Sequence, residues 1–206
     1  MSLVLALLGV AMLGGQPGIS ADRQRQLVAE YANCVVKRMP RKAKAVVLSD
    51  RDSGAAVARY DEVLSPDCMP LGENDGSMTM RTWPFLIRVS LAQALVQAEP
   101  SLGLPPLATV PPLEHGTPAK PSSKDAALGI AMSRVGECVV RTAPEPATEL
   151  IRADVASPAE AAAFEAVKPA LSSCLSAGET FAFSPELLRG AVALNYYRLA
   201  KAGEKK

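Results

Sequence analysis

The sequence has few aromatic residues and almost no net charge. Aromatic side chains make up 4% of its 206 residues, and 22 basic residues are nearly balanced by 21 acidic ones, which leaves a formal charge of +1. The scarcity of aromatics argues against a many-stranded β protein, an aromatic sugar-binding platform and a surface on which bases stack. The charge balance excludes a dominant electrostatic attraction to nucleic acid, although it leaves room for a local basic patch. We therefore expect no nucleic-acid partner.

Residues and motifs that usually carry catalysis are also scarce. His115 is the only histidine, so metal sites rich in histidine are excluded, and its place in a proline-rich segment predicts a solvent-exposed side chain. The chain has no Gly-x-Ser-x-Gly turn, no phosphate-binding Gly-x-x-x-x-Gly-Lys loop and no dinucleotide fingerprint. We assign no catalytic residue, no metal site and no cofactor.

The longest apolar run lies near the beginning of the chain. It covers residues 3–13 without a charged side chain. A run of this length is too short to cross a bilayer, which needs about 20 apolar residues. It is instead typical of the core of a secretory signal peptide, although no Lys or Arg precedes Arg23. We predict a signal peptide over 1–21, export to the periplasm or the medium, and no transmembrane span in the mature chain.

The four cysteines divide the chain into two similar parts. Cys34 and Cys68 are separated by 34 positions, and Cys138 and Cys174 by 36. The first cysteine of each pair begins a Cys-Val-Val-basic sequence, and these two sequences are 104 positions apart. We predict a tandem duplication. Its parts are the units 22–98 and 125–202 and a short tail, 203–206.

The duplication also predicts how the cysteines pair. Four cysteines allow three pairings, and only Cys34–Cys68 with Cys138–Cys174 makes the two units equivalent. Closing loops of this size should stabilise the fold by about 3–4 kcal/mol for each bond in the chain-entropy model. A four-thiolate zinc site is the competing interpretation, but zinc sites usually contain a local Cys-x-x-Cys pair, and this chain has none.

Helical spacing of apolar residues recurs in both units. The first cysteine of each unit closes one such pattern, as Leu27, Tyr31 and Cys34 do in the first unit. A second pattern runs into the second cysteine, a third forms a last helix, and a shorter helix lies between the first two. The sequence Ser-Pro-Ala-Glu at 157–160 is typical of a helix start. We predict an all-α protein in which each unit has three main helices and a short one.

Proline is concentrated between the two units. Seven of the 26 residues in 99–124 are proline, against ten in the rest of the chain. This segment therefore cannot be helical throughout and should be partly extended. Two interpretations remain open: the segment is a solvated linker, or it crosses a surface of the units as a strap through regularly spaced aliphatic residues. Those residues are Leu102, Leu104, Leu107, Val110 and Leu113.

Basic side chains are clustered in the first unit. Five of them lie within eight residues shortly after the first cysteine, where the second unit carries mainly acidic side chains. The cluster is a solvated turn, a patch that binds a phosphate-bearing surface polymer or lipid headgroups, or a surface attracted to the second unit. We call it the basic patch. Its members are Lys37, Arg38, Arg41, Lys42 and Lys44.

Two glutamates and two arginines occupy matching positions in the units. Each glutamate follows a glycine after the second cysteine, and each arginine lies in an otherwise apolar last helix. We predict structural ion pairs between Glu73 and Arg88 and between Glu179 and Arg189. The alternative role for the two glutamates is catalysis, because paired carboxylates can hydrolyse a glycoside without histidine.

The sequence favours a non-catalytic function, because it contains no clustered catalytic set. We expect an exported, disulfide-stabilised protein that binds a ligand or is associated with the cell envelope. Its partner, whose identity the sequence does not give, would lie on the basic patch or in the groove between the two units. Candidate partners are an envelope protein and an anionic surface component. The alternative is a hydrolase that uses acidic residues in the cleft between the units.

Overall fold

The computed structural model describes five stretches of the chain, and every regular element in them is a helix. Seven α-helices and two short 3-10 helices occur in these stretches, with no strand among them, which confirms the predicted all-α fold. The described stretches are 19–49, 60–69, 84–115, 124–175 and 184–204. The α-helices are α1 (Ala21–Arg38), α2 (Pro40–Leu48), α4 (Pro84–Ala98), α5 (Lys124–Thr142), α6 (Pro144–Arg152), α7 (Pro158–Cys174) and α8 (Pro185–Gly203). The 3-10 helices are Pro66–Cys68 and Leu107–Thr109.

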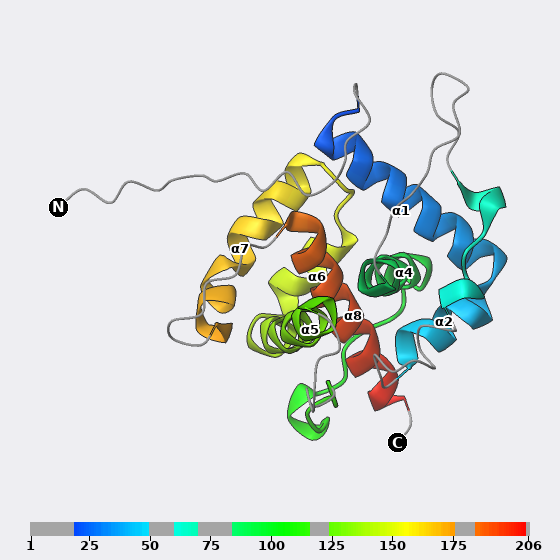
Figure 1. The fold of residues 1–206 in the computed structure, drawn as a ribbon. Coiled ribbons are helices and arrows are strands. Elements are labelled where there is room, and N and C mark those ends of the chain that lie inside the picture. Colours follow the sequence, from blue (N-terminus) through cyan, green and yellow to red (C-terminus); the bar gives the residue numbers. More distant parts are fainter. Residues whose placement is uncertain (1–18, 50–59, 70–83, 116–123, 176–183, 205–206) are drawn as a thin grey trace.

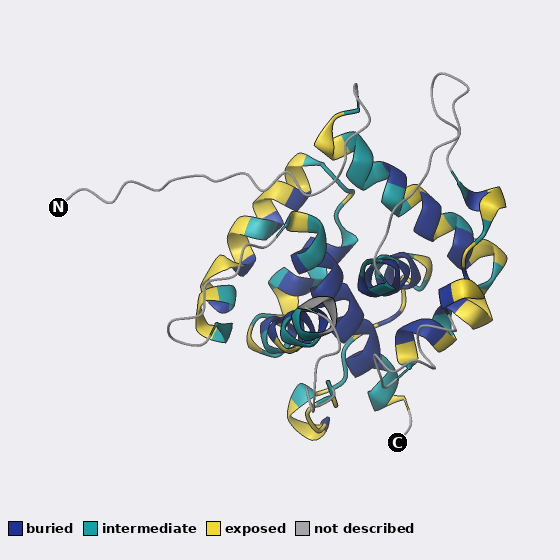
Figure 2. Cartoon of the chain, in the orientation of Figure 1, coloured by how far each residue is buried: buried dark blue, intermediate teal, exposed yellow. Residues whose placement is uncertain are grey.

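Helices α4 and α8 form the centre of the molecule and pack against each other (Figure 1). Every residue of α8 from Leu188 to Ala200 is buried, and most of α4 is buried as well. Helices that are apolar on all sides belong in a core rather than at a surface. Figure 2 shows the dark shading of buried residues along α8, whereas α1, α2 and α7 carry exposed residues on their outer sides.

The remaining helices pack on two sides of this central pair. Helices α1 and α2 contact α4, whereas α5 and α6 contact α8, and α7 packs against α5 and α6. One side of the molecule is therefore built from the first part of the chain and the other side from the second part (Figure 1).

Serine side chains mark the beginnings of three helices. The hydroxyls of Ser20, Ser157 and Ser184 each accept a hydrogen bond from the backbone N–H three residues ahead. This bond satisfies a donor that has no partner inside the helix. Proline follows Ser157 and Ser184 at the first helical position. The helix start predicted at 157–160 is confirmed.

Both predicted disulfides are present. The Cys34–Cys68 bond joins α1 to the 3-10 helix Pro66–Cys68, and the Cys138–Cys174 bond joins α5 to the last residue of α7. The paired Cα atoms are 5.6 and 5.7 Å apart, which is within the range that a disulfide requires. All four cysteines are thereby paired.

One predicted helix is interrupted. The apolar spacing predicts a helix that continues into Cys68, but the described helical residues end at Asp61, a turn follows, and Pro66 begins a separate 3-10 helix. Proline disfavours helical backbone at the residue before it and has no N–H to donate. The Tyr31 hydroxyl stabilises the non-helical backbone, because it accepts a hydrogen bond from the Ser65 N–H at 3.1 Å.

The proline-rich segment packs on the molecule as far as His115. Leu102 and Val110 are buried, and the other three of its five aliphatic residues are partly buried against the core. The described part of the segment therefore lies against the core, as the strap interpretation expects. Residues 116–123 lie outside the described stretches. We call residues 99–115 the strap.

The predicted signal peptide lies mostly outside the described residues, which begin at Ile19. Its last residue, Ala21, is the first residue of α1, and Ser20 caps that helix. Cleavage after Ala21 would therefore remove the cap of α1. In the described part of the chain, none of the helices combines the length and the apolar character needed to cross a membrane.

Candidate functional site

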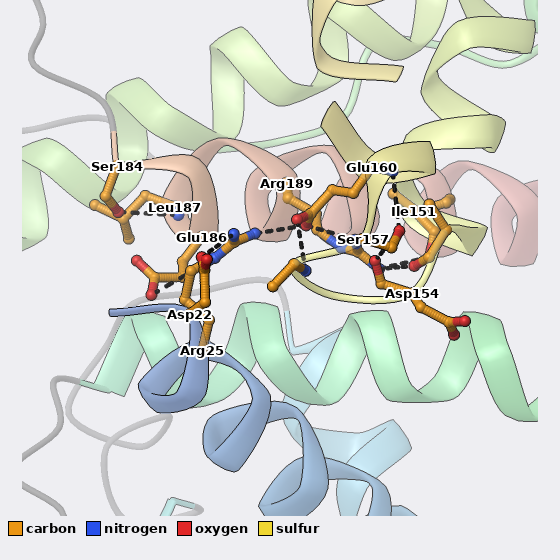
Figure 3. Close-up of polar contacts among 12 residues, drawn as sticks. Asp22, Arg25, Ile151, Asp154, Ser157, Glu160, Ser184, Glu186, Leu187 and Arg189 are labelled. Carbon is orange, nitrogen blue, oxygen red and sulfur yellow. Dashed lines mark hydrogen bonds and ion pairs between the residues drawn. The ribbon is translucent and has the colours of Figure 1, made fainter. Parts of the chain in front are cut away.

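A buried ion cluster joins the two sides of the molecule (Figure 3). Glu160 of α7 lies between two arginines: its Oε1 atom is 2.5 Å from Arg25 Nη2 and 2.6 Å from Arg189 Nη1. Its Oε2 atom accepts a hydrogen bond from the Ala156 N–H at 2.8 Å. The side chains of Glu160 and Arg189 are only 3% and 1% exposed. The cluster therefore ties α1, α7 and α8 together.

The cluster keeps the Glu160 carboxylate charged. Burial raises the pKa of Glu160, but hydrogen bonds from Arg25, the Ala156 N–H and Arg189 outweigh burial and hold the pKa below its usual value. Burial also lowers the pKa of Arg189, and the contact with Glu160 opposes that shift. An ionised carboxylate has no proton to give, so Glu160 is not suited to act as a general acid.

Little space is available beside the cluster. The crevice between α1, α4 and α8, lined by Arg25, Glu186 and Gly190 among others, has a volume of about 20 Å³. A volume of this size holds about one water molecule. A sugar or an acyl group would not fit, so the cluster connects helices rather than binding a substrate.

The structure gives Arg189 a partner that the sequence did not suggest. Glu73 and Glu179, the predicted partners of Arg88 and Arg189, lie outside the described residues, so those two ion pairs stay predictions. Within the described residues Arg189 pairs with Glu160, which the sequence identified only as part of a helix start. The two residues are 29 positions apart, and no local pattern indicates their contact.

Arg88 and Arg189 close the short helices of their own sides in the same way. Both side chains are buried, and Nη2 of each donates to two backbone carbonyls at the end of the short helix. Carbonyls at a helix C-terminus lack partners within the helix and carry partial negative charge, so a guanidinium group stabilises them. The acceptors are Val47 and Ser49 at the end of α2, and Ile151 and Ala153 at the end of α6.

The basic patch lies at the end of α1 and along α2. Two of its five members pair with acidic side chains, Arg38 with Asp67 at 2.7 Å and Lys44 with Glu99 at 2.9 Å. The other three are exposed, and they have no acidic partner among the described residues. These three are Lys37, Arg41 and Lys42.

A groove opens beside the patch, between α1, α2 and α4. Its volume is about 610 Å³, far larger than that of the crevice at the ion cluster. Three buried side chains, Val36, Ala94 and Leu95, form its apolar floor. We call it the first groove. Its rim is mainly polar and consists of Asn33, Lys37, Pro40, Lys44, Gln97, Ala98 and Glu99.

His115 is buried, so the prediction of a solvent-exposed side chain is wrong. The side chain is 8% exposed, and its Nε2 atom is 2.5 Å from Glu137 Oε2. Glu137 also accepts hydrogen bonds from the Leu113 N–H at 3.0 Å and from Arg141 Nε at 2.7 Å. Burial raises the pKa of Glu137, but the contacts with His115, Leu113 and Arg141 outweigh burial and hold it below its usual value. The packing of the strap brings His115 to this position.

Glutamate and arginine side chains on α5 and α8 bind the main chain of the second half of the strap. Glu137 accepts the Leu113 N–H, Arg141 donates to three carbonyls at 3.0, 3.2 and 2.8 Å, and Arg198 donates to a fourth at 3.0 Å. No sequence pattern indicated this role for Glu137, Arg141 or Arg198. The accepting carbonyls belong to Leu107, Val110, Pro111 and Glu114.

Glu99 links α2 to α8 at the beginning of the strap. Its carboxylate lies 2.9 Å from Lys44 Nζ and from Lys201 Nζ, and the Tyr197 hydroxyl donates to it at 3.0 Å. Burial raises the pKa of Glu99, but Lys44, Lys201 and Tyr197 outweigh burial and lower it. Burial and the Glu99 charge raise the pKa of Tyr197. The Tyr197 hydroxyl therefore keeps its proton and remains a donor.

No metal site or known relative points to a function. Within the described stretches, no three His, Cys, Asp or Glu side chains are grouped so that they could hold a metal ion. Comparison of the chain with protein-family models, with curated proteins and with solved structures finds no match in any of the three. The basic patch, the first groove and the ion cluster are therefore the features from which a function can be argued.

Proposed function

We propose that the protein is an exported, non-catalytic binding protein whose basic patch binds a phosphate-bearing component of the cell envelope. One observation carries this proposal: Lys37, Arg41 and Lys42 are exposed and have no acidic partner among the described residues. The two glutamates that are buried among the described residues, Glu137 and Glu160, are in contrast engaged with arginine or histidine side chains. Unpaired surface cations attract phosphate groups, and several of them on one face bind an anionic surface additively.

The disulfides support export. Disulfides form and persist mainly in oxidising compartments such as the periplasm and the extracellular space. Both pairs of cysteines in this chain are bonded. The apolar run over 3–13 has the length of a signal-peptide core. We therefore place the protein outside the cytosol.

The tandem duplication of units 22–98 and 125–202 is also part of the proposal. Each side of the molecule has a long helix, a short helix and a buried last helix in the same order. The long helix of each side carries a disulfide, and Arg88 and Arg189 close the two short helices alike. These shared features support a common origin of the two units.

A contact in the centre of the molecule supports the duplication as well. Matching positions in the last helices, such as Arg88 and Arg189, are 101 residues apart, which makes Gly190 the counterpart of Val89. These two counterparts touch each other, because a Cβ atom built on Gly190 would lie 2.5 Å from Val89 Cγ2. Contact between equivalent residues is expected where a two-fold axis relates two units.

A second pair of contacts also joins equivalent positions of the two units. Arg25 of α1 lies 3.9 Å from Glu186 of α8. The counterpart of Arg25 at an offset of 104 is Gly129, and the counterpart of Glu186 at an offset of 101 is Phe85. These two residues also face each other, since a Cβ atom on Gly129 would lie 3.2 Å from the Phe85 ring.

No observation on the described residues favours the hydrolase. Glu160 is the most buried carboxylate at the junction of the two sides, and its contacts with Arg25 and Arg189 leave it charged and enclosed. The crevice beside it has a volume of only about 20 Å³. A glycosidase of the usual kind needs two carboxyl groups that face an accessible sugar. We therefore prefer the binding function.

Binding of the mature, oxidised protein to phosphate groups tests the proposal. Co-sedimentation with phosphatidylglycerol vesicles and titration with polyphosphate separate a lipid from a polymer, and phosphatidylcholine vesicles serve as the neutral reference. We expect binding to at least one anionic probe that weakens as salt is added. The double variant Arg41→Gln/Lys42→Gln should bind about tenfold or more weakly, since each basic residue near an anionic surface contributes about 1 kcal/mol.

A control variant removes the same charge from another surface. Arg134 and Lys168 are exposed on α5 and α7, and Arg134→Gln/Lys168→Gln should retain the affinity of the wild type. Equal losses in both double variants would indicate a response to net charge rather than to the patch. Either that result or a wild-type protein that binds neither anionic probe would reject the proposal.

A further inference from the structure

The first groove has a counterpart on the other side of the molecule, and the strap covers that counterpart. Applying the offset of 104 to α1 converts Asn33 and Lys37 into Glu137 and Arg141, and the offset of 101 converts Gln97 of α4 into Arg198 of α8. Glu137, Arg141 and Arg198 all bind the main chain of the second half of the strap. The surface formed by α5, α6 and α8 is therefore an occupied groove, whereas none of the described segments of the chain covers the first groove.

The polar rim of the first groove preserves the hydrogen-bonding roles of the occupied groove. Glu137 accepts a strap N–H, and the amide oxygen of Asn33 can accept one as well. Arg141 donates to strap carbonyls, and the Lys37 ammonium group is a donor at the matching position. The third pair matches in the same way, because the Gln97 amide can donate to a carbonyl as Arg198 does.

The apolar floor is preserved at two of its three positions. Val36 and Leu95 lie under the first groove, and their counterparts Val140 and Tyr196 are buried on the strap side. The Tyr196 hydroxyl donates to the Leu102 carbonyl of the strap at 3.4 Å. Apolar floor and polar rim together suit an extended chain, because an extended chain offers aliphatic side chains to the floor and N–H and C=O groups to the rim.

We propose that the first groove binds an extended, proline-rich segment of a partner protein, similar in chemistry to the strap. Proline favours the extended polyproline conformation before binding, so such a segment loses little conformational entropy when it docks. Lys37 on the rim, which has no acidic partner among the described residues, favours a segment that carries an acidic residue. The inference rests on the proposed duplication but is independent of phosphate binding by the patch.

A peptide with the sequence of the strap is the probe. We would titrate the mature, oxidised protein into a fluorescently labelled peptide of residues 104–115 and follow its anisotropy. Saturable binding is expected. A scrambled peptide of the same composition should bind much more weakly, because binding depends on the spacing of the aliphatic side chains and not on composition.

A groove-filling variant locates the binding site. Ala98 is exposed on the rim of the first groove, so Ala98→Trp blocks the groove without disturbing the core and should weaken peptide binding about tenfold or more. Ala166 is exposed on α7, and Ala166→Trp should leave binding unchanged. Asn33→Ala/Gln97→Ala removes two polar partners without adding bulk and should weaken binding as well.

Three outcomes would overturn the inference. The first is the absence of saturable binding, and the second is equal binding by the wild type and by Ala98→Trp. The third is a wild-type protein that is dimeric and becomes monomeric in Ala98→Trp, because the occupant would then be the strap of a second copy. The phosphate proposal is tested separately, by vesicle and polyphosphate binding of Arg41→Gln/Lys42→Gln. Ala98→Trp should retain vesicle and polyphosphate binding and lose only peptide binding.

Discussion

The Glu160 carboxylate compensates the charges of two arginines, Arg25 and Arg189. Its side chain and that of Arg189 are almost fully buried, and Arg25 is 10% exposed. Glu160→Gln removes the negative charge and leaves both guanidinium groups facing an amide. Leaving buried charges without compensation costs about 3–5 kcal/mol. We expect a loss of that size in the free energy of unfolding, measured by urea denaturation of the oxidised protein.

An exposed glutamate of the same helix is the matched control. Glu165 pairs with Lys168 at 2.6 Å, and both side chains are more than 60% exposed. Glu165→Gln should change the free energy of unfolding by no more than about 1 kcal/mol, because water screens such pairs. If the two variants lost the same stability, the arginines of the cluster would have to be hydrated rather than buried.

The same cluster predicts how stability responds to acid. The pKa of Glu160 is lower in the folded protein than its ordinary value of 4.5, so the unfolded chain takes up a proton first as the pH falls. The stability that Glu160 contributes is therefore complete above pH 4.5 and is lost as the pH falls from there through the lowered folded-state pKa.

Wild type and Glu160→Gln compared across pH isolate this contribution. The difference between their free energies of unfolding should be constant at neutral pH and should shrink in the acid range. Denaturation series at constant ionic strength give that difference directly. A difference that stayed the same down to the lowest accessible pH would mean that the carboxylate is not the origin of the effect.

At the scale of helices, the crossing of α4 and α8 depends on Gly190. A Cβ atom at this position would lie 2.5 Å from Val89 Cγ2 and 2.7 Å from Val89 Cβ, so Gly190→Ala overpacks the crossing. Overpacking of this kind costs about 1–3 kcal/mol. Adding Val89→Gly removes both contacts, so the double variant should lose less stability than the sum of the two single variants. Thermal denaturation of the two single variants and the double variant would reveal that coupling, and additive losses would exclude it.

Arg141 holds the second half of the strap against α5. Arg141→Ala removes donors to three strap carbonyls and a partner of Glu137, so amide exchange at Leu113 should become faster. Hydrogen exchange followed by mass spectrometry measures this effect over the strap. Lys37→Ala, the counterpart in the first unit, should leave exchange in the strap unchanged. An effect of equal size from Lys37→Ala would contradict the assignment of the strap to the second side.

Local patterns predicted the elements but not the long-range contacts. Apolar periodicity and the serine at 157 indicated the described helices correctly except the one expected to reach Cys68, and the cysteine spacing indicated both disulfides. The break before Pro66 is local too, and the proline itself could have predicted it. The contact between Arg25 and Glu160 spans 135 positions, and that between His115 and Glu137 spans 22. Apolar periodicity describes one helix at a time, so it carries no information about contacts between residues this far apart in the sequence.

For the whole molecule, the central pair of helices predicts cooperative unfolding. Because α4 and α8 are buried against each other, neither side can unfold without exposing the other. Cys138→Ser/Cys174→Ser removes a constraint from the second side only, at a cost of about 3–4 kcal/mol in the chain-entropy model. We expect a single transition at lower temperature, with coincident signals from far-UV and near-UV circular dichroism. Two separate transitions, only one of them shifted, would show that the sides unfold independently.

Because of the strap, the two grooves are not equally accessible to a peptide. It follows α4 directly in the sequence and lies along the groove that Arg141 and Arg198 border. A free peptide that binds there must displace the strap. Because the strap is part of the same chain, its effective concentration at the groove is of millimolar order. Beside Asn33 and Lys37, no segment that the structure describes occupies the groove. The intact chain should therefore bind one such peptide. A chain cut within the strap, so that the strap can leave its groove, should bind a second.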